Sequence, residues 1–109
     1  MIIESRGDLV AQAAYWDVVR AVPGGTVSPG GAAVMLGVSR QRIQEIVKLP
    51  GVRAWVFHYP FSVQAAYMEI SVRDIVAYGF RVGRIKSIDE VPLIGEDIKR
   101  QVIELLNDC

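Results

Sequence analysis

The sequence predicts a mainly α fold with one small β-hairpin, flanked by an N-terminal and a C-terminal helix. Three observations support this fold class. Apolar residues recur at helical spacing on both sides of Gly37 within residues 29–48. Residues 52–57 form a β-branched and aromatic run and residues 61–70 a second apolar run, as the two strands of a hairpin do. Apolar stripes in residues 8–22 and 95–107 indicate one further helix at each end.

The N-terminal helix is expected to span residues 8–22, with Asp8 as the residue that caps it. Its apolar residues lie on a wide arc, since Val10 and Val18 stand beside Leu9 and Trp16. The Pro-Gly-Gly sequence that follows ends the helix.

Residues 29–48 predict two short helices joined by a glycine turn. Ala33 and Leu36 lie on one face of the first helix, and the small Ala33 allows the second helix to cross closely. Gly37 follows the last periodic residue, where a helix ends in a left-handed conformation that glycine adopts without strain. Ser39 is expected to cap the second helix, over residues 39–49, by accepting hydrogen bonds from backbone N–H groups.

The second helix buries Ile43, Ile46 and Val47, and its remaining face is polar and basic. Arginine donates two hydrogen bonds to guanine and glutamine pairs with the adenine edge, so this face has the chemistry of base recognition. A helix N-terminus that carries a serine also favours a phosphate. The plainer interpretation is a helical hairpin whose polar face is merely solvated. The candidate DNA-binding residues are Ser39, Arg40, Gln41, Arg42, Gln44, Lys48 and Arg53.

After the hairpin, Ser71-Val-Arg-Asp74 is typical of a capping box, and a helix continues through Tyr78. The order helix, turn, helix, two-stranded wing, helix is that of a winged helix-turn-helix domain. Within residues 27–79 the chain resembles the MerR-like and excisionase-like helix-turn-helix family. The segments that carry this resemblance are Ala32-Ala33, residues 36–41, Ile46-Val47, residues 51–54 and residues 70–75.

The resemblance implies that the second helix and the wing bind DNA, often in dimers or cooperative arrays. By this resemblance the residues that read bases are Ser39, Arg40, Gln41 and Gln44, and Arg53 approaches a phosphate. One departure concerns the wing, because residues 55–69 contain no Lys or Arg, whereas wings of such families are usually basic. Either this aromatic wing packs on an apolar surface, or it binds DNA only weakly.

Residues 80–94 are expected to form an extended connector to the C-terminal helix of residues 95–107. Within it, residues 80–86 alternate apolar and basic side chains, which suits either a third short strand or an arm that contacts phosphates. The whole chain, residues 1–109, is expected to be one domain. Its terminal helices either enlarge the core or form a homodimer interface, and we favour the homodimer because paired half-sites sharpen DNA recognition.

The net charge is zero, with 12 basic and 12 acidic residues, but the charges are unevenly distributed. Residues 40–86 hold eight basic side chains against three acidic ones, and residues 87–109 hold two against six. A basic centre beside an acidic tail suits a surface for double-stranded DNA. The start lacks the features of a signal peptide, no segment has the length and apolarity of a membrane span, and the single Cys109 excludes an internal disulfide. We therefore expect a soluble, cytoplasmic protein.

These observations predict a sequence-specific DNA-binding protein, either a small transcription regulator or an excisionase-like factor, that reads the major groove with residues 39–49. The alternative is a helix-turn-helix module for protein interaction or assembly that does not bind DNA. An enzyme is not expected, because His58 stands alone and the sequence has no metal-ligand spacing and no phosphate-binding glycine motif. We also expect no cofactor, no metal, no membrane partner and no small-molecule effector.

Overall fold

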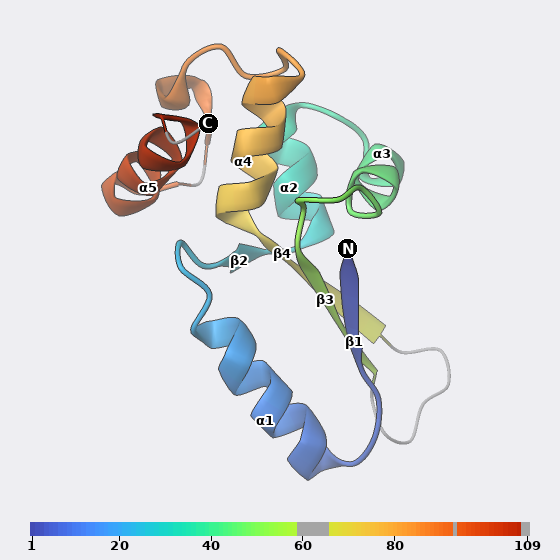
Figure 1. Ribbon diagram of the computed structural model, residues 1–109. Helices are drawn as coiled ribbons and strands as arrows, with labels where there is room; N and C mark the ends of the chain where they lie inside the picture. The colour runs from blue at the N-terminus through green and yellow to red at the C-terminus, as the bar shows by residue number, and fades with distance from the viewer. Residues whose placement is uncertain (59–65, 93, 108–109) are drawn as a thin grey trace.

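The computed structural model describes residues 1–58, 66–92 and 94–107. Its four strands form one mixed sheet in the order β1-β3-β4-β2, in which β1 runs parallel to β3 and the other neighbours are antiparallel (Figure 1). In chain order the elements are β1 (Ile2–Ser5), α1 (Leu9–Arg20), β2 (Thr26–Val27), α2 (Pro29–Leu36), α3 (Arg40–Ile46), β3 (Ala54–His58), β4 (Ala66–Ser71), α4 (Val72–Arg81), the 3₁₀-helix η1 (Ile88–Glu90) and α5 (Glu96–Asn107).

The predicted fold class, mainly α with a small hairpin wing, is wrong. The described residues form a small α/β fold with five α-helices and a four-stranded mixed sheet. The β3–β4 hairpin is present, but β1 extends it at one edge and β2 at the other. Local sequence patterns do not reveal either added strand, because β2 has only two residues and β1 pairs with residues 54–57, far along the chain.

The sheet separates two hydrophobic clusters, because successive side chains of β3 point to opposite faces. Ala54 belongs to the larger cluster, together with buried residues of α2, α3 and α4. Trp55 and Phe57 belong to the smaller cluster, together with Val19 of α1. One face of the sheet is therefore covered by α1 and the other by α2 and α4, against which α3 and α5 pack. Figure 1 shows α1 and α3 at opposite ends of the molecule.

Aromatic packing accounts for the lack of basic residues in the hairpin. The Phe57 side chain is 1% exposed, and its ring centroid lies 4.9 Å from that of Trp16, 5.2 Å from Tyr15 and 5.0 Å from Tyr67. These rings hold α1 against the sheet, so Phe57 is no docking surface. The expected wing tip lies outside the described residues, within residues 59–65.

Local signals placed several helix ends correctly. Asp8 caps α1 by accepting a hydrogen bond from the Ala11 N–H at 2.8 Å. Gly37 ends α2 in the left-handed region, with φ of 67°. Ser71 caps α4, although the Asp74 carboxylate that would complete a capping box binds Arg53 instead.

Three predicted boundaries need correction. The N-terminal helix ends at Arg20 rather than at residue 22, and α3 ends at Ile46, so Lys48 lies in the turn beyond it. Residues 80–86 are not a third strand, because α4 continues to Arg81 and a turn follows it.

The C-terminal helix α5 packs against the core. Val102 is fully buried in the larger cluster, and Ile98 packs against the same cluster. Among the helices described, none combines the length and the apolar character needed to cross a membrane.

Candidate nucleic-acid interface

The helix-turn-helix unit of α2 and α3 is fixed by a short, heavily hydrogen-bonded turn. The Val38 N–H donates to the Ala33 carbonyl at 3.0 Å. From outside the unit, Arg84 donates through Nε to the Leu36 carbonyl at 3.2 Å and through Nη2 to the Gly37 carbonyl at 2.7 Å. Arg84 thereby satisfies carbonyl groups that the end of α2 leaves unpaired.

Helix α3 is anchored by its apolar side. Ile43, Ile46 and Val47 are at most 2% exposed, so the orientation of the helix is set by the core. The Ser39 Oγ accepts a hydrogen bond from the Arg42 N–H at 3.1 Å, as predicted for a capping residue. One lone pair of the Ser39 Oγ is therefore used by the helix cap, and the second lone pair stays available to another donor.

The outward side of α3 carries long polar side chains that the protein does not use. All are exposed, and within the described part of the chain none makes a side-chain hydrogen bond or an ion pair. A row of unpartnered donors on a rigid helix is available for an external ligand. These residues are Arg40, Gln41, Gln44 and, just beyond the helix end, Lys48.

Arg42 is placed differently from the other predicted residues. Its Nη1 lies 2.6 Å from the Glu45 Oε2, and both side chains are more than half exposed. The hydrogen bond that Arg42 donates to Glu45, followed by the nearby phenol of Tyr78, raises the pKa of Arg42 above its ordinary value. Sequence reasoning did not include Glu45 in the site, although its three-residue spacing from Arg42 was a readable signal for this pair.

The structure gives Arg53 an internal role. Its Nε lies 2.7 Å from the Asp74 Oδ2 and its Nη2 3.3 Å from the Oδ1, and its backbone N–H also donates to Oδ2 at 3.0 Å. The Asp74 side chain is only 10% exposed. If the Arg53 guanidinium moved away to contact a DNA phosphate, the Asp74 carboxylate would stay buried without its main partner. Leaving a buried charge unpaired costs free energy. A phosphate contact by Arg53, as predicted from the sequence, would therefore require this internal ion pair to break.

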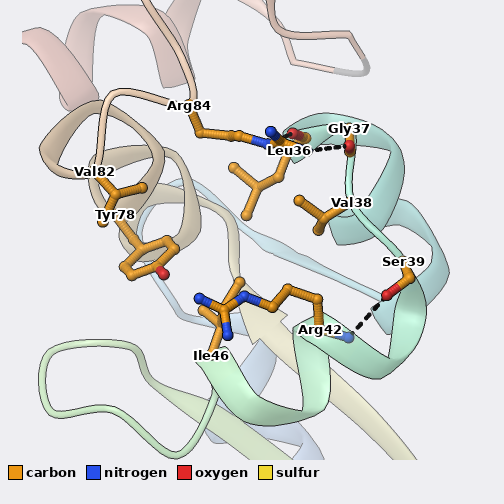
Figure 2. A pocket seen from close by; sticks show the side chains of 9 residues that line it. All are labelled: Leu36, Gly37, Val38, Ser39, Arg42, Ile46, Tyr78, Val82 and Arg84. Carbon is orange, nitrogen blue, oxygen red and sulfur yellow. Dashed lines mark hydrogen bonds between the residues drawn. The ribbon is translucent and has the colours of Figure 1, made fainter.

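Two hollows flank α3. On the β4 side, Arg40 and Gln44 line a hollow of about 350 Å³ together with Glu69. On the α4 side, Arg42 lines a larger pocket of about 670 Å³ between the α2–α3 turn and the end of α4 (Figure 2). The residues around the larger pocket, called the turn pocket below, are Leu36, Gly37, Val38, Ser39, Arg42, Ile46, Tyr78, Val82 and Arg84.

Figure 2 shows how the polar groups of the turn pocket face one another. Arg42 reaches from α3 toward Tyr78, and Arg84 crosses the opposite rim to the end of α2. The sequence offered Arg84 only as part of a possible arm, and it gave no indication of Tyr78, whose position depends on the packing of α4 beside α2.

Comparison of the chain with protein-family models, with curated proteins and with solved structures finds no match. The features of the chain that bear on its function are therefore the geometry of α3 and the groups beside it.

Proposed function

We propose that this is a cytoplasmic DNA-binding protein that inserts α3 into the major groove of double-stranded DNA. The observation that carries the proposal is the row of exposed, internally unpartnered polar side chains on a core-anchored helix. An α-helix is about 10–12 Å across with its side chains, and the major groove is about 12 Å wide, so one helix fits with its sides near both backbones. A small transcription regulator or an excisionase-like factor would work in this way.

The roles of the residues follow from their places on α3. The N-terminal part of a recognition helix contacts base edges, which favours Arg40, Gln41 and Gln44 for base reading. Lys48, beyond the helix end, suits a phosphate as a point charge. Glu45 opposes binding through its charge but also offers an acceptor to the amino group of cytosine.

Titration of the protein into a labelled random-sequence duplex at two salt concentrations tests the proposal. We expect binding at low salt that weakens steeply as salt rises, because each neutralised phosphate releases counterions. A selection for preferred sites follows, in which Gln44→Ala should relax sequence preference by about 1–3 kcal/mol. The control is Asn107→Ala, which removes an exposed amide at the end of α5. Absence of binding at low salt would refute the proposal.

A second candidate function, a protein-interaction module, is favoured by the outer face of α1. Leu9, Val10 and Val18 are 67%, 79% and 60% exposed, so apolar side chains also stand on the outer side of this helix, beside the exposed Asp17–Arg20 ion pair. We infer a second copy of the chain as the partner of this face. In an antiparallel pair, Val10 of one helix meets Val18 of the other, because these two residues lie eight positions apart on one stripe of the helix.

Sedimentation of the wild type and of Val10→Glu distinguishes a homodimer from a monomer. The expected result is a concentration-dependent dimer that the charge abolishes, with Ile103→Glu on α5 as the control. A monomeric wild type would remove both the predicted homodimer and this second candidate.

A further inference from the structure

The turn pocket combines two cations, a phenol and an apolar wall on one flank of α3. Arg42 and Arg84 stand at opposite sides, the Tyr78 hydroxyl points toward Arg42, and Val38 and Val82 supply methyl groups (Figure 2). Among the described residues that line it, none carries a carboxylate. This set of groups suits a ligand with a negatively charged head and a small apolar body.

The position of the pocket relative to α3 identifies such a ligand. The walls of the major groove are the two sugar–phosphate backbones, so a pocket beside an inserted helix faces backbone, whereas long side chains at the helix edge, such as Arg40 and Gln44, extend past the backbone to base edges. Arg42 lies on the flank toward α4, on the side of the helix opposite the hollow that Arg40 and Gln44 line. A backbone passing this flank would run across the mouth of the pocket.

We propose that the turn pocket binds one deoxyribose-phosphate unit of the DNA backbone, with Arg42, Tyr78 and Arg84 holding the phosphate. This inference rests on the proposed function. The sugar would lie against Val38 and Val82, and a backbone phosphate would anchor the α4 side of the helix-turn-helix unit.

Free donors are available at the required places. Arg84 uses Nε and Nη2 for the carbonyls of Leu36 and Gly37, and its Nη1 has no partner among the described residues. Arg42 gives one hydrogen bond to Glu45 through Nη1, and this exposed pair is held weakly. Arg42 therefore exchanges Glu45 for the phosphate when DNA binds, and Glu45 acts as a brake on binding.

The opposite flank is less suited to a phosphate. Glu69 lines the hollow beside Arg40 and accepts a hydrogen bond from the Thr26 hydroxyl at 2.9 Å, which holds the carboxylate in place. A fixed negative charge there repels a phosphate. The α4 flank is therefore the one on which we place the tight backbone contact.

The salt dependence of DNA binding tests the inference. Arg42→Gln should lower the magnitude of the slope of log affinity against log salt by about 0.9, the value for one lost phosphate contact. Arg100→Gln on α5 makes the same change in net charge far from the pocket and should leave the slope unchanged. Glu45→Gln should strengthen binding more than the control Glu104→Gln, because it releases Arg42.

A double-mutant cycle separates this pocket from a general effect of charge. Tyr78→Phe should weaken binding about tenfold in the wild type, because a hydrogen bond to a charged group is lost, and much less in Arg42→Gln, because both groups act on one phosphate. The four proteins should have the same circular dichroism spectrum, which excludes misfolding as the cause.

The outcomes distinguish this inference from the proposed function. Salt-sensitive binding by the wild type, with Arg42→Gln and Tyr78→Phe indistinguishable from Arg100→Gln, would overturn the pocket and leave DNA binding in place. Loss of all DNA binding would overturn both. If inorganic phosphate shifts the amide resonances of Gly37 and Ser39 saturably while the DNA slopes of the variants match the wild type, the pocket takes free phosphate and not the backbone.

Discussion

Replacement of Asp74 by alanine tests the internal role that the structure gives to Arg53. Asp74 accepts three hydrogen bonds from Arg53, one from the backbone N–H and two from the guanidinium. The substitution leaves this N–H and the cation without their acceptor. We therefore expect Asp74→Ala to destabilise the fold and not merely to change the surface charge.

The magnitude follows from the burial of the two partners. Removing one partner of a fully buried ion pair costs about 3–5 kcal/mol, whereas an exposed pair contributes about 0.2–1 kcal/mol. Asp74 is 10% exposed and Arg53 36% exposed, so water screens one side of the pair. Adding about 1 kcal/mol for the backbone N–H that loses its acceptor, we expect a total of about 2–3 kcal/mol. For a chain of this length that corresponds to a fall in Tm of about 10 °C.

Thermal unfolding followed by far-ultraviolet circular dichroism measures this effect. The matched control is Asp97→Ala, which removes an exposed pair, because Asp97 and Arg100 lie 3.3 Å apart with side chains 84% and 69% exposed. We expect the control to cost at most about 1 kcal/mol, including the loss of a favourable charge near the start of α5. Equal Tm values for the two variants would refute the reasoning.

DNA binding by Arg53→Ala provides an independent check on the same pair. Because the Arg53 guanidinium is engaged by Asp74, its removal should lower the Tm but leave the slope of log affinity against log salt unchanged. A slope reduced by about 0.9 with an unchanged Tm would restore Arg53 as a phosphate contact.

Three further changes test the fold. Gly37→Val should cost about 1–2 kcal/mol of unfolding free energy through backbone strain alone, since φ is +67° and no atom lies within 4 Å of an added Cβ. The control Gly37→Asn should cost less. Equal urea midpoints for the two variants would contradict the turn geometry. Phe57→Ala should cost about 3–5 kcal/mol in urea unfolding, because it empties the centre of the aromatic cluster, and a cost below about 1 kcal/mol would show that α1 is not held there. Burial, and then the Glu4 carboxylate, raise the pKa of Tyr15 above its ordinary value of 10.0. The folded state therefore holds the proton of the Tyr15 hydroxyl more tightly than the unfolded state does. The stability that this protonated hydroxyl contributes is present below pH 10 and is lost as pH rises through the raised pKa. Tyr15→Phe should reduce this alkaline loss in Tm measurements, and an identical loss would exclude the tyrosine as its cause.

Local sequence determined the features that depend on a few neighbouring residues. Asp8 and Ser39 read as helix caps because a side-chain oxygen reaches a backbone N–H three residues later. Gly37 read as a helix end because only glycine adopts a left-handed conformation without strain. The apolar spacing of Ile43, Ile46 and Val47 gave the buried side of α3, and so the polar side that carries the candidate interface.

Only the tertiary structure decided which distant residues meet. Residues 2–5 became a strand because residues 54–57 offered a free edge, and this pairing made the fold α/β. From the sequence, Arg53 was expected to be free to contact a phosphate. In the structure, Asp74 at the start of α4 forms an ion pair with it. The aromatic residues of β3 pack against α1, a contact that the sequence did not predict. The physical reason is the same in each case: a strand edge, an ion pair and an apolar face are completed by partners whose positions the chain path sets, and local spacing carries no record of that path.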